Sequence, residues 1–209
     1  YSITKIADSL KENANAVIRL NKIDITIVSQ RNMNIKTQRI VTVLNEKGLN
    51  DTDAYQHYDK TTSIKNIEAI IYDAFGNEIK KIKRKDFKDQ SAVSGSTLFS
   101  DSRLLYLEYT PVFYPFTIVY NCELETSTTA NIPSWYPLRG YFVSVEKNIL
   151  NVTYPINLGF RKKEFQFSNF NIQKTIDTET QLSYTASYLL AQKPEDYSPP
   201  FFQLYPKLM

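Results

Sequence analysis

Residue types that could perform catalysis are scarce in this sequence of 209 residues, which holds one Cys and one His. A cysteine nucleophile must be accessible and paired with a base such as histidine. Cys122 lies in an alternating apolar run and shares its parity with Ile118 and Leu124, so a strand here would turn the thiol toward the core. A buried thiol behaves as a small hydrophobic side chain. We therefore predict a structural role for Cys122.

The remaining chemical groups do not assemble into a known motif. His57 lies in the polar stretch 53–59, which predicts a loop histidine without a catalytic role. One Cys and one His exclude an internal disulfide and the Cys- or His-rich zinc motifs. Asp51 and Asp53 fall in the same predicted loop, so paired-carboxylate catalysis would need a cleft in which such acids converge. We predict no catalytic residue, no metal and no cofactor.

Basic residues cluster in one short stretch that includes Lys81, Lys83 and Arg84. Lysines on a strand face typically discourage edge-to-edge pairing, and this is the reading that the pattern favours. The alternative is a contact with an anionic partner, although nearby acids dilute the field. The net charge of +3 and the pI of about 8.7 do not indicate a nucleic-acid partner.

Proline-flanked aromatic residues offer a second candidate binding surface. They include Phe113, Tyr114, Trp135 and Tyr136. Aromatic rings beside prolines are typical of plugs at strand ends, and this reading is favoured here. The alternative function is a carbohydrate-binding module that stacks sugars on these rings. A glycan or a peptide would then be the partner.

Strands must position all of these residues. The chain has 15 Tyr, 12 Phe and only 5 Gly, and branched and aromatic side chains favour pleated structure. Alternation predicts one long hairpin and a second hairpin followed by two strands that together form the centre of an antiparallel sheet. The first covers 16–28 and 33–44; the second group covers 64–72, 78–85, 103–109 and 116–124. Further runs are predicted at 140–160, 163–170 and 173–190.

The total of roughly ten to twelve strands exceeds what one flat sheet usually holds, so we predict an all-β, two-layer antiparallel β-sandwich with at most short helices. Residues 1–191 are expected to form this domain, with 1–15 as an arm or short helix. The stretch 49–60 is predicted to be a loop or one helical turn, and 86–101 a long polar connection. The proline-rich stretch 192–209 is expected to pack back on the domain and to act as a linker toward a further domain.

Several short motifs occur together in one order: Val41–Gly48, Tyr58–Lys60, Tyr72–Lys80, Phe87–Asp89, Leu98–Arg103, Pro115–Tyr120 and Trp135. In this order and spacing the chain resembles the N-terminal domain of unknown function that precedes a transglutaminase-like domain in secreted proteins of Gram-negative bacteria. The resemblance is clear from about Ala16 to Pro155 and looser toward the C-terminus.

The resemblance implies a β-sandwich, export to the periplasm or cell surface, and a downstream domain that holds a Cys, His and Asp triad. Neither Cys122 nor His57 matches that triad, so no catalytic role carries over. The chain begins at Tyr1, which removal of a secretion signal or a shortened chain would each explain. No apolar run reaches the roughly 18 to 20 residues that span a bilayer. We expect a non-catalytic accessory domain that serves as a scaffold or presents a substrate.

Overall fold

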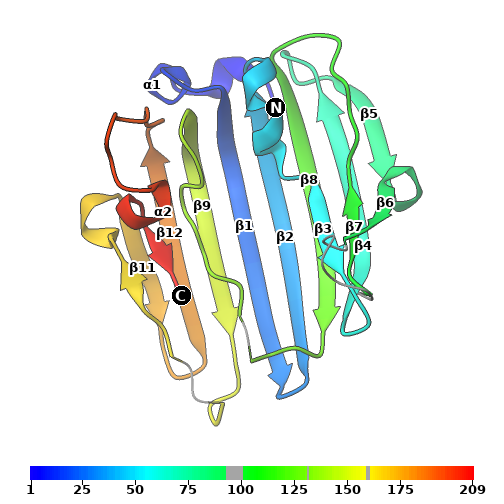
Figure 1. The fold of residues 1–209 in the computed structure, drawn as a ribbon, viewed down its shortest axis with the longest axis vertical. Coiled ribbons are helices and arrows are strands. Elements are labelled where there is room, and N and C mark those ends of the chain that lie inside the picture. The colour runs from blue at the N-terminus through cyan, green and yellow to red at the C-terminus, as the bar shows by residue number, and fades with distance from the viewer. Residues whose placement is uncertain (93–100, 131, 159–160) are drawn as a thin grey trace.

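A computed structural model of the chain describes residues 1–92, 101–130, 132–158 and 161–209. Within these ranges the protein is built mainly of strands (Figure 1). Eight of the described strands form one main sheet in the order β11-β12-β9-β1-β2-β8-β4-β5. Their bounds are β1 Ala16–Ser29, β2 Asn32–Val43, β4 Thr62–Tyr72, β5 Glu78–Lys83, β8 Phe116–Thr126, β9 Val143–Thr153, β11 Ile172–Asp177 and β12 Gln181–Leu189.

Smaller elements lie over one face of this sheet, as Figure 1 shows for β3, β7 and α2. A three-stranded sheet has the order β3-β7-β6, and a short ribbon pairs β10 with β13. The short strands are β3 Tyr55–Tyr58, β6 Lys88–Ser91, β7 Arg103–Tyr106, β10 Glu164–Phe165 and β13 Lys207–Leu208. The helical turns are η1 Ile3–Lys5, α1 Asp8–Lys11, η2 Glu46–Thr52, η3 Arg84–Asp86, η4 Phe167–Asn169 and α2 Phe201–Leu204. The prediction of an all-β sandwich with short helices is confirmed.

The two predicted hairpins are present. β1 pairs with β2 in antiparallel register, from Ala16 opposite Val43 to Ser29 opposite Asn32. β4 pairs with β5 across a turn in which Gly76 has a φ of 94°, a conformation that glycine adopts without strain. The Asp73 carboxylate accepts hydrogen bonds from the amides of Phe75 and Asn77 at 2.9 and 2.8 Å and holds this turn.

One pairing departs from the predicted antiparallel arrangement. β9 runs parallel to β1, with Ala16 opposite Val143 and Thr26 opposite Thr153. Parallel neighbours need a long crossover, and here the intervening chain includes β2 to β8. β9 and the β11–β12 hairpin therefore extend the sheet on the free side of β1.

The two faces of the main sheet differ in chemistry. We call the face beneath the small sheet the covered face; it carries the buried side chains of Ile25, Met33 and Ile118. On the opposite face Lys36 pairs with Glu123 at 3.2 Å, and both side chains are exposed. Exposed pairs of this kind stabilise little. The free energy of folding therefore comes mainly from apolar burial on the covered face.

A second, small core lies at one end of the sheet under the first residues of the chain. Ile6, Leu10 and Ala14 pack there against Val17. Val17 has the opposite parity to Ala16, which belongs to the main core, so this cluster covers the other face of β1. Residues 1–15 thus form an arm with two short helical turns, η1 and α1.

Three sequence predictions need correction. β7 was expected in the centre of the main sheet but lies between β3 and β6 in the small sheet. The stretch 55–58 was expected to belong to a loop or a helical turn and is strand β3. Its sequence lacks an alternating apolar pattern, and its extended backbone is held by pairing with β7. The stretch 163–170 is a two-residue strand and a helical turn. Short strands of this kind raise the described total to thirteen, above the expected range.

Three predictions extend beyond the described residues. The predicted polar connection 86–101 begins at the last residue of η3 and contains β6, and its residues 93–100 lie outside the description. The motif Leu98–Arg103 overlaps the same gap. The run predicted to reach Phe160 ends as strand β9 at Thr153, and residues 159–160 are not described.

Candidate ligand-binding site

Polar side chains form a row across the covered face, where apolar residues are expected. The row consists of Asn148 on β9, Asn21 on β1, Arg39 on β2 and Tyr120 on β8, which are paired neighbour to neighbour. All four residues are at most 4% exposed. Because buried polar groups cost free energy unless they are hydrogen-bonded, this row must be satisfied locally.

The amide of Asn148 satisfies one end of the row. Its Oδ1 accepts hydrogen bonds from Asn21 Nδ2 at 3.0 Å and from Trp135 Nε1 at 2.8 Å. Its Nδ2 donates to the carbonyl oxygen of Pro137 at 3.0 Å. The network fixes the segment 135–139 against the sheet and so determines where Arg139 lies.

Arg39 lies beside this network and is held by the end of η2. Its Nη2 donates to the carbonyl oxygen of Asp51 at 3.1 Å and forms an ion pair with Asp53 Oδ2 at 2.9 Å. Arg139 Nη1 donates to the same Asp53 oxygen at 2.7 Å. Asp53 caps η2 in a left-handed conformation, with a φ of 46°. One carboxylate therefore joins two guanidinium groups from separate segments.

Burial shifts the pKa values of this cluster, which holds the two arginines together with Asp51 and Asp53. Burial lowers the pKa of Arg39, because a guanidinium in an apolar setting loses its hydration. Burial, followed by the nearby Asp53 charge, raises the pKa of Asp51 to about 6. Arg39 Nε is buried with no hydrogen-bond partner among the described residues, a deficit that typically costs about 1–3 kcal/mol. A further acceptor at this guanidinium would remove that cost.

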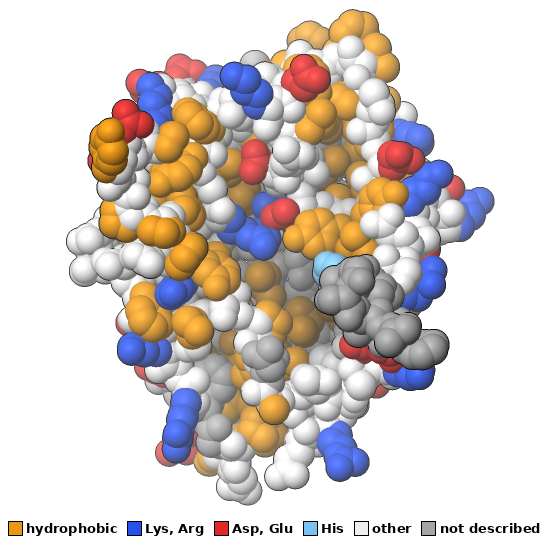
Figure 2. All heavy atoms as spheres, viewed as in Figure 1, with side chains coloured by type: hydrophobic (Ala, Val, Ile, Leu, Met, Phe, Trp, Pro, Cys, Tyr) orange, Lys and Arg blue, Asp and Glu red, His pale blue; other side chains and the backbone are white. Residues whose placement is uncertain are grey.

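A cavity of about 270 Å³ opens beside the cluster. We call it the arginine cavity; it is lined by Asn21, Ile23, Thr37, Arg39, Asp53, Tyr55, Gln56, Tyr120, Pro133, Ser134, Trp135, Tyr136 and Arg139. Figure 2 shows the covered face hollowed near its middle, with basic and acidic side chains gathered beside the hollow. Concave sites with a few convergent polar groups are typical of ligand binding.

Aromatic residues form a second hollow that adjoins the first. We call it the aromatic shelf; it is lined by Tyr136, Leu138, Arg139, Gly140, Tyr141, Phe201, Phe202, Tyr205 and Pro206 and encloses about 510 Å³. Phe201 and Tyr205 stack with their ring centroids 3.9 Å apart. Tyr136 and Arg139 line both hollows, so the two adjoin at these residues.

Another hollow, of about 680 Å³, lies where Ile27, Leu150 and Leu208 meet. Its lining includes Ala130 and Leu158, which are the sequence neighbours of residues outside the described ranges. We assign no site to it.

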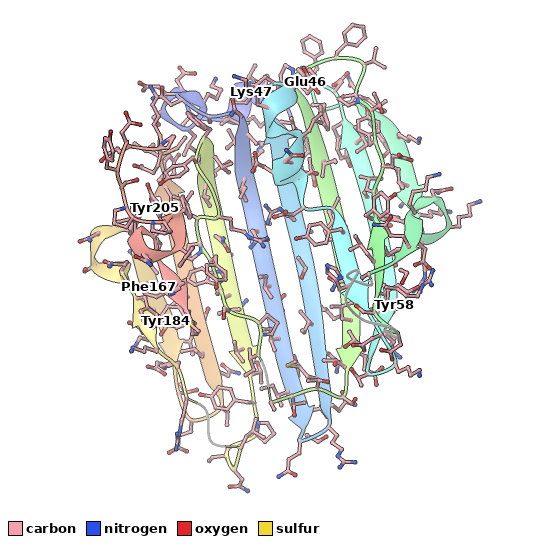
Figure 3. All side chains as sticks on the ribbon, viewed as in Figure 1. Glu46, Lys47, Tyr58, Phe167, Tyr184 and Tyr205 are labelled. Atoms are coloured by element: carbon pink, nitrogen blue, oxygen red, sulfur yellow. The ribbon has the colours of Figure 1, made fainter. Side chains whose placement is uncertain are left out.

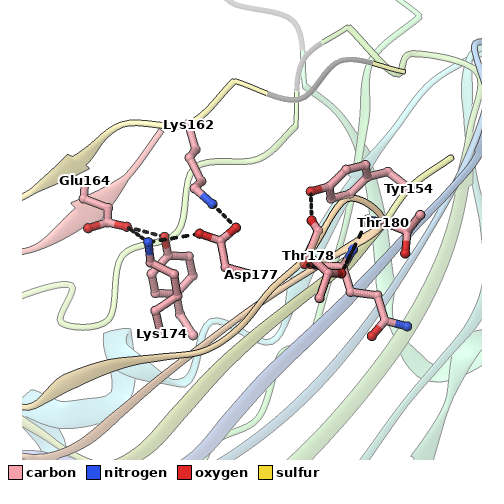
Figure 4. A network of polar contacts seen from close by, with 9 residues as sticks. Tyr154, Lys162, Glu164, Lys174, Asp177, Thr178 and Thr180 are labelled. Atoms are coloured by element: carbon pink, nitrogen blue, oxygen red, sulfur yellow. Dashed lines mark hydrogen bonds and ion pairs between the residues drawn. The ribbon is translucent and has the colours of Figure 1, made fainter. Parts of the chain in front are cut away.

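Lysine and carboxylate side chains also gather near β11, as Figure 4 shows. Lys174 lies 3.1 Å from Asp177 and 3.4 Å from Glu164, and Lys162 also pairs with Asp177. All of these side chains are at least 24% exposed, so solvent screens them. We read this network as a tie between the 162–164 segment and the β11–β12 hairpin.

The two residues first considered for catalysis lie in different sheets. Cys122 is 2% exposed on the covered face of β8, as predicted. Burial raises its pKa to about 11, so the thiolate is scarce at neutral pH. His57 lies on β3 opposite Leu104 and has an edge contact with the ring of Tyr55. Among the described residues, no group of three or more His, Cys, Asp or Glu is arranged to hold a metal ion.

The predicted basic surface lies at an edge of the main sheet. Lys81 and Lys83 are exposed on β5, the last strand on that side, and Lys81 lies 3.5 Å from Glu68. Arg84 donates to the carbonyl oxygen of Ile64. This position fits an edge strand protected by lysines.

The predicted aromatic surface is divided. Phe113 is 80% exposed and Tyr114 is 36% exposed, in the loop before β8. Trp135 is 1% exposed, with its ring beside Phe167 and Tyr184. The favoured prediction of a core plug is confirmed for Trp135, and the alternative in which it formed part of an accessible binding surface is wrong. Figure 3 shows Phe167 and Tyr184 on the β11–β12 side of the molecule.

Tyr136 alone of the predicted surface residues lines the arginine cavity accessibly, with 37% exposure. Sequence reasoning did not select Arg39 or Arg139, and it set Asp53 aside as a loop residue. One signal was present: Arg39 occupies an inward position in the β2 alternation of Met33 and Val41.

Fold and site together define an all-β domain whose single large sheet carries a polar, arginine-lined cavity on its covered face. A family model described as a domain of unknown function with solved structure, DUF3857, matches residues 30–191. The chain belongs to this family. No curated protein matched the sequence. Among the described residues, no helix is long and apolar enough to cross a membrane.

One solved structure shows the same fold. A candidate protease from Parabacteroides distasonis is similar with a TM-score of 0.70 and 12% identity. The match covers 93% of this chain and 39% of that protein, so the chain spans about two fifths of its length. An M1 zinc metallopeptidase from Deinococcus radiodurans matches over 93% of this chain and 42% of its own, with a TM-score of 0.36 and 5% identity.

Proposed function

We propose that the chain is a non-catalytic accessory domain, a scaffold or substrate-presenting module of an exported transglutaminase-like or peptidase-like protein. The observation that carries this proposal is the arginine cavity. Its charged groups are two arginines and one aspartate, and tyrosines and uncharged polar side chains complete the lining beside the Asn148 network. Such a set is suited to holding a ligand in a fixed place.

The burial of Cys122 and its separation from His57 support a non-catalytic role for this chain. Acyl transfer through cysteine requires a thiolate next to a histidine. Here burial disfavours the thiolate of Cys122, and His57 belongs to the other sheet. The chemistry is therefore assigned to another domain of the same protein, for which the transglutaminase-like triad is the proposed source.

Similarity to a longer protein supports an accessory role. The fold covers only 39% of the Parabacteroides distasonis candidate protease, where it is one portion of a larger chain. Export to the periplasm or cell surface is part of the proposal and rests on the sequence resemblance to secreted proteins.

A direct test compares the isolated chain with the protein encoded by the full reading frame. The isolated chain is expected to show neither peptide hydrolysis nor amine transfer to glutamine peptides, whether Cys122 is present or replaced by Ala. Activity in the isolated chain that disappears in Cys122→Ala would refute the proposal. If the full protein is active, removal of residues 1–209 should lower kcat/KM for peptides, and an unchanged value would count against substrate presentation.

Cell fractionation tests the location. The full-length protein, expressed with its own leader, is expected in the periplasmic or surface fraction. Recovery solely with cytoplasmic markers would contradict export. We do not put forward carbohydrate binding, because the burial of Trp135 removes the largest ring from the surface on which that alternative depended.

A further inference from the structure

We propose that the arginine cavity binds a carboxylate and that the aromatic shelf receives an aromatic group of the same ligand, so that the domain recognises a peptide ending in an aromatic residue. The inference rests on the proposed function for the ligand being a peptide. The residues of the arginine cavity indicate the carboxylate, and those of the aromatic shelf indicate the ring.

Asp53 faces the positive charges of two arginines. Arg39 and Arg139 both contact Asp53 Oδ2, at 2.9 and 2.7 Å, so two cations share one oxygen. The Arg39 side chain is only 5% exposed, and water cannot fully replace a missing counter-ion at such depth. The Asp51 charge also acts on Arg39, but the hydrogen bond between them uses the backbone carbonyl oxygen of Asp51. An anion in the cavity would therefore supply a second carboxylate contact to the two guanidinium groups.

Arg39 has N–H groups that its contacts with Asp51 and Asp53 do not use. A guanidinium carries five N–H groups in a planar fork. The contacts of Arg39 with Asp51 and Asp53 use Nη2, its Nε is buried and unpartnered among the described residues, and its side chain lines the arginine cavity. Carboxylates are the ligands that best match a guanidinium fork, because their two oxygens accept two parallel hydrogen bonds.

The arginine cavity and the aromatic shelf adjoin, and each has a volume that suits one part of such a ligand. At about 270 Å³, the arginine cavity is large enough for the end of a chain but small for an extended segment. The aromatic shelf meets it at Tyr136 and Arg139, and Phe202 there is 57% exposed. A C-terminal aromatic residue carries a carboxylate and a ring within one amino acid, which matches the neighbouring hollows. Figure 3 labels Tyr205, a ring of the shelf, on the β12 side of the covered face.

The test is a titration of the ¹⁵N-labelled chain followed by NMR, with N-acetyl-L-phenylalanine as the probe. Two control compounds are used. The amide of N-acetyl-L-phenylalanine lacks the carboxylate charge, and acetate lacks the aromatic ring. We expect the acid to bind at least about tenfold more tightly than either control compound, with shifts at residues of the arginine cavity and the aromatic shelf. Equal binding of the amide would overturn the carboxylate assignment, and equal binding of acetate would overturn the role of the shelf.

Two variants test whether N-acetyl-L-phenylalanine binds at the arginine cavity. Arg139 is 47% exposed, so Arg139→Gln is expected to fold and to weaken binding of the acid at least about tenfold. Arg31→Gln is the matched control, because Arg31 is exposed in the β1–β2 turn, eight residues or about 26 Å along the strand from Arg39. Dispersed spectra verify that each variant is folded. Binding that survives Arg139→Gln, or that falls equally in Arg31→Gln, would overturn the inference.

The outcomes separate this inference from the proposed function. An inactive chain that binds acid and amide equally would leave the accessory role standing and remove the carboxylate site. A chain that prefers the acid and also hydrolyses peptides through Cys122 would keep the site and remove the non-catalytic role.

Discussion

Replacing Asp53 with Asn should destabilise the protein by about 3 kcal/mol. Removing one partner of a buried ion pair usually costs about 3–5 kcal/mol, because the other charge stays buried and unpaired. Arg39 is the buried partner, whereas Asp53 is 21% and Arg139 47% exposed at their side chains, which places the effect at the lower end. Asn has a similar size and tolerates the left-handed backbone at this position, so the change removes chiefly the charge.

The assays are urea unfolding, which gives the free energy, and thermal unfolding, which gives Tm, both at pH 7.5 and both monitored by circular dichroism and the fluorescence of Trp135. In a chain of this size each kcal/mol lowers Tm by about 2–4 °C, so Asp53→Asn should lose roughly 6–12 °C. Glu123→Gln is the control, because its partner Lys36 lies at 3.2 Å and both side chains are well exposed. The control should cost less than about 1 kcal/mol.

A double variant distinguishes charge from shape. Arg39→Met combined with Asp53→Asn leaves no buried charge at this point and should recover most of the lost stability. If Asp53→Asn stays within about 1 kcal/mol of wild type, or if the double variant is as unstable as the single one, then Asp53 does not compensate the buried guanidinium and the reasoning is wrong.

Three further measurements address other features. Gly48→Ala should cost about 1–3 kcal/mol, because its added Cβ would lie 2.2 Å from the Asn15 carbonyl oxygen, whereas Gly140→Ala has open space and should be neutral in the same unfolding assay. The thiol of Cys122 should react with a disulfide reagent at pH 8 at least about 100-fold more slowly in the folded chain than in urea, and similar rates would contradict its burial. The folded pKa of Asp51, about 6, lies above its ordinary value, so the folded state holds the proton more tightly and stability falls as the pH rises from about 4 to 6. Asp51→Asn should therefore raise Tm at pH 7.5 and leave it unchanged at pH 3.5, and equal shifts at both pH values would refute this linkage.

The fold was predictable where the pattern is local. Alternation placed β1, β2, β4 and β8, because period-two burial is written into each strand separately. It also placed Cys122 in the core. β7 was assigned to the wrong sheet, because a four-residue strand does not reveal which partner it pairs with.

The site was less predictable, because it depends on register between distant strands. Asn21 and Asn148 meet only through the parallel pairing of β1 with β9, 127 residues apart. Asp53 was read as a loop residue, and its meeting with Arg139 follows from the tertiary structure alone. Arg39 at an inward position was the one local clue.

The junction between β1 and β9 also bears on the order of folding. During synthesis the β1–β2 hairpin can form early, while the partner for the other side of β1 emerges only after more than a hundred further residues. Contacts so far apart in sequence slow folding, because a long loop must close before they form. In the nascent chain that side of β1 is an unpaired edge open to aggregation, so a chaperone that shields it until Val143–Thr153 emerges should raise the yield of native protein.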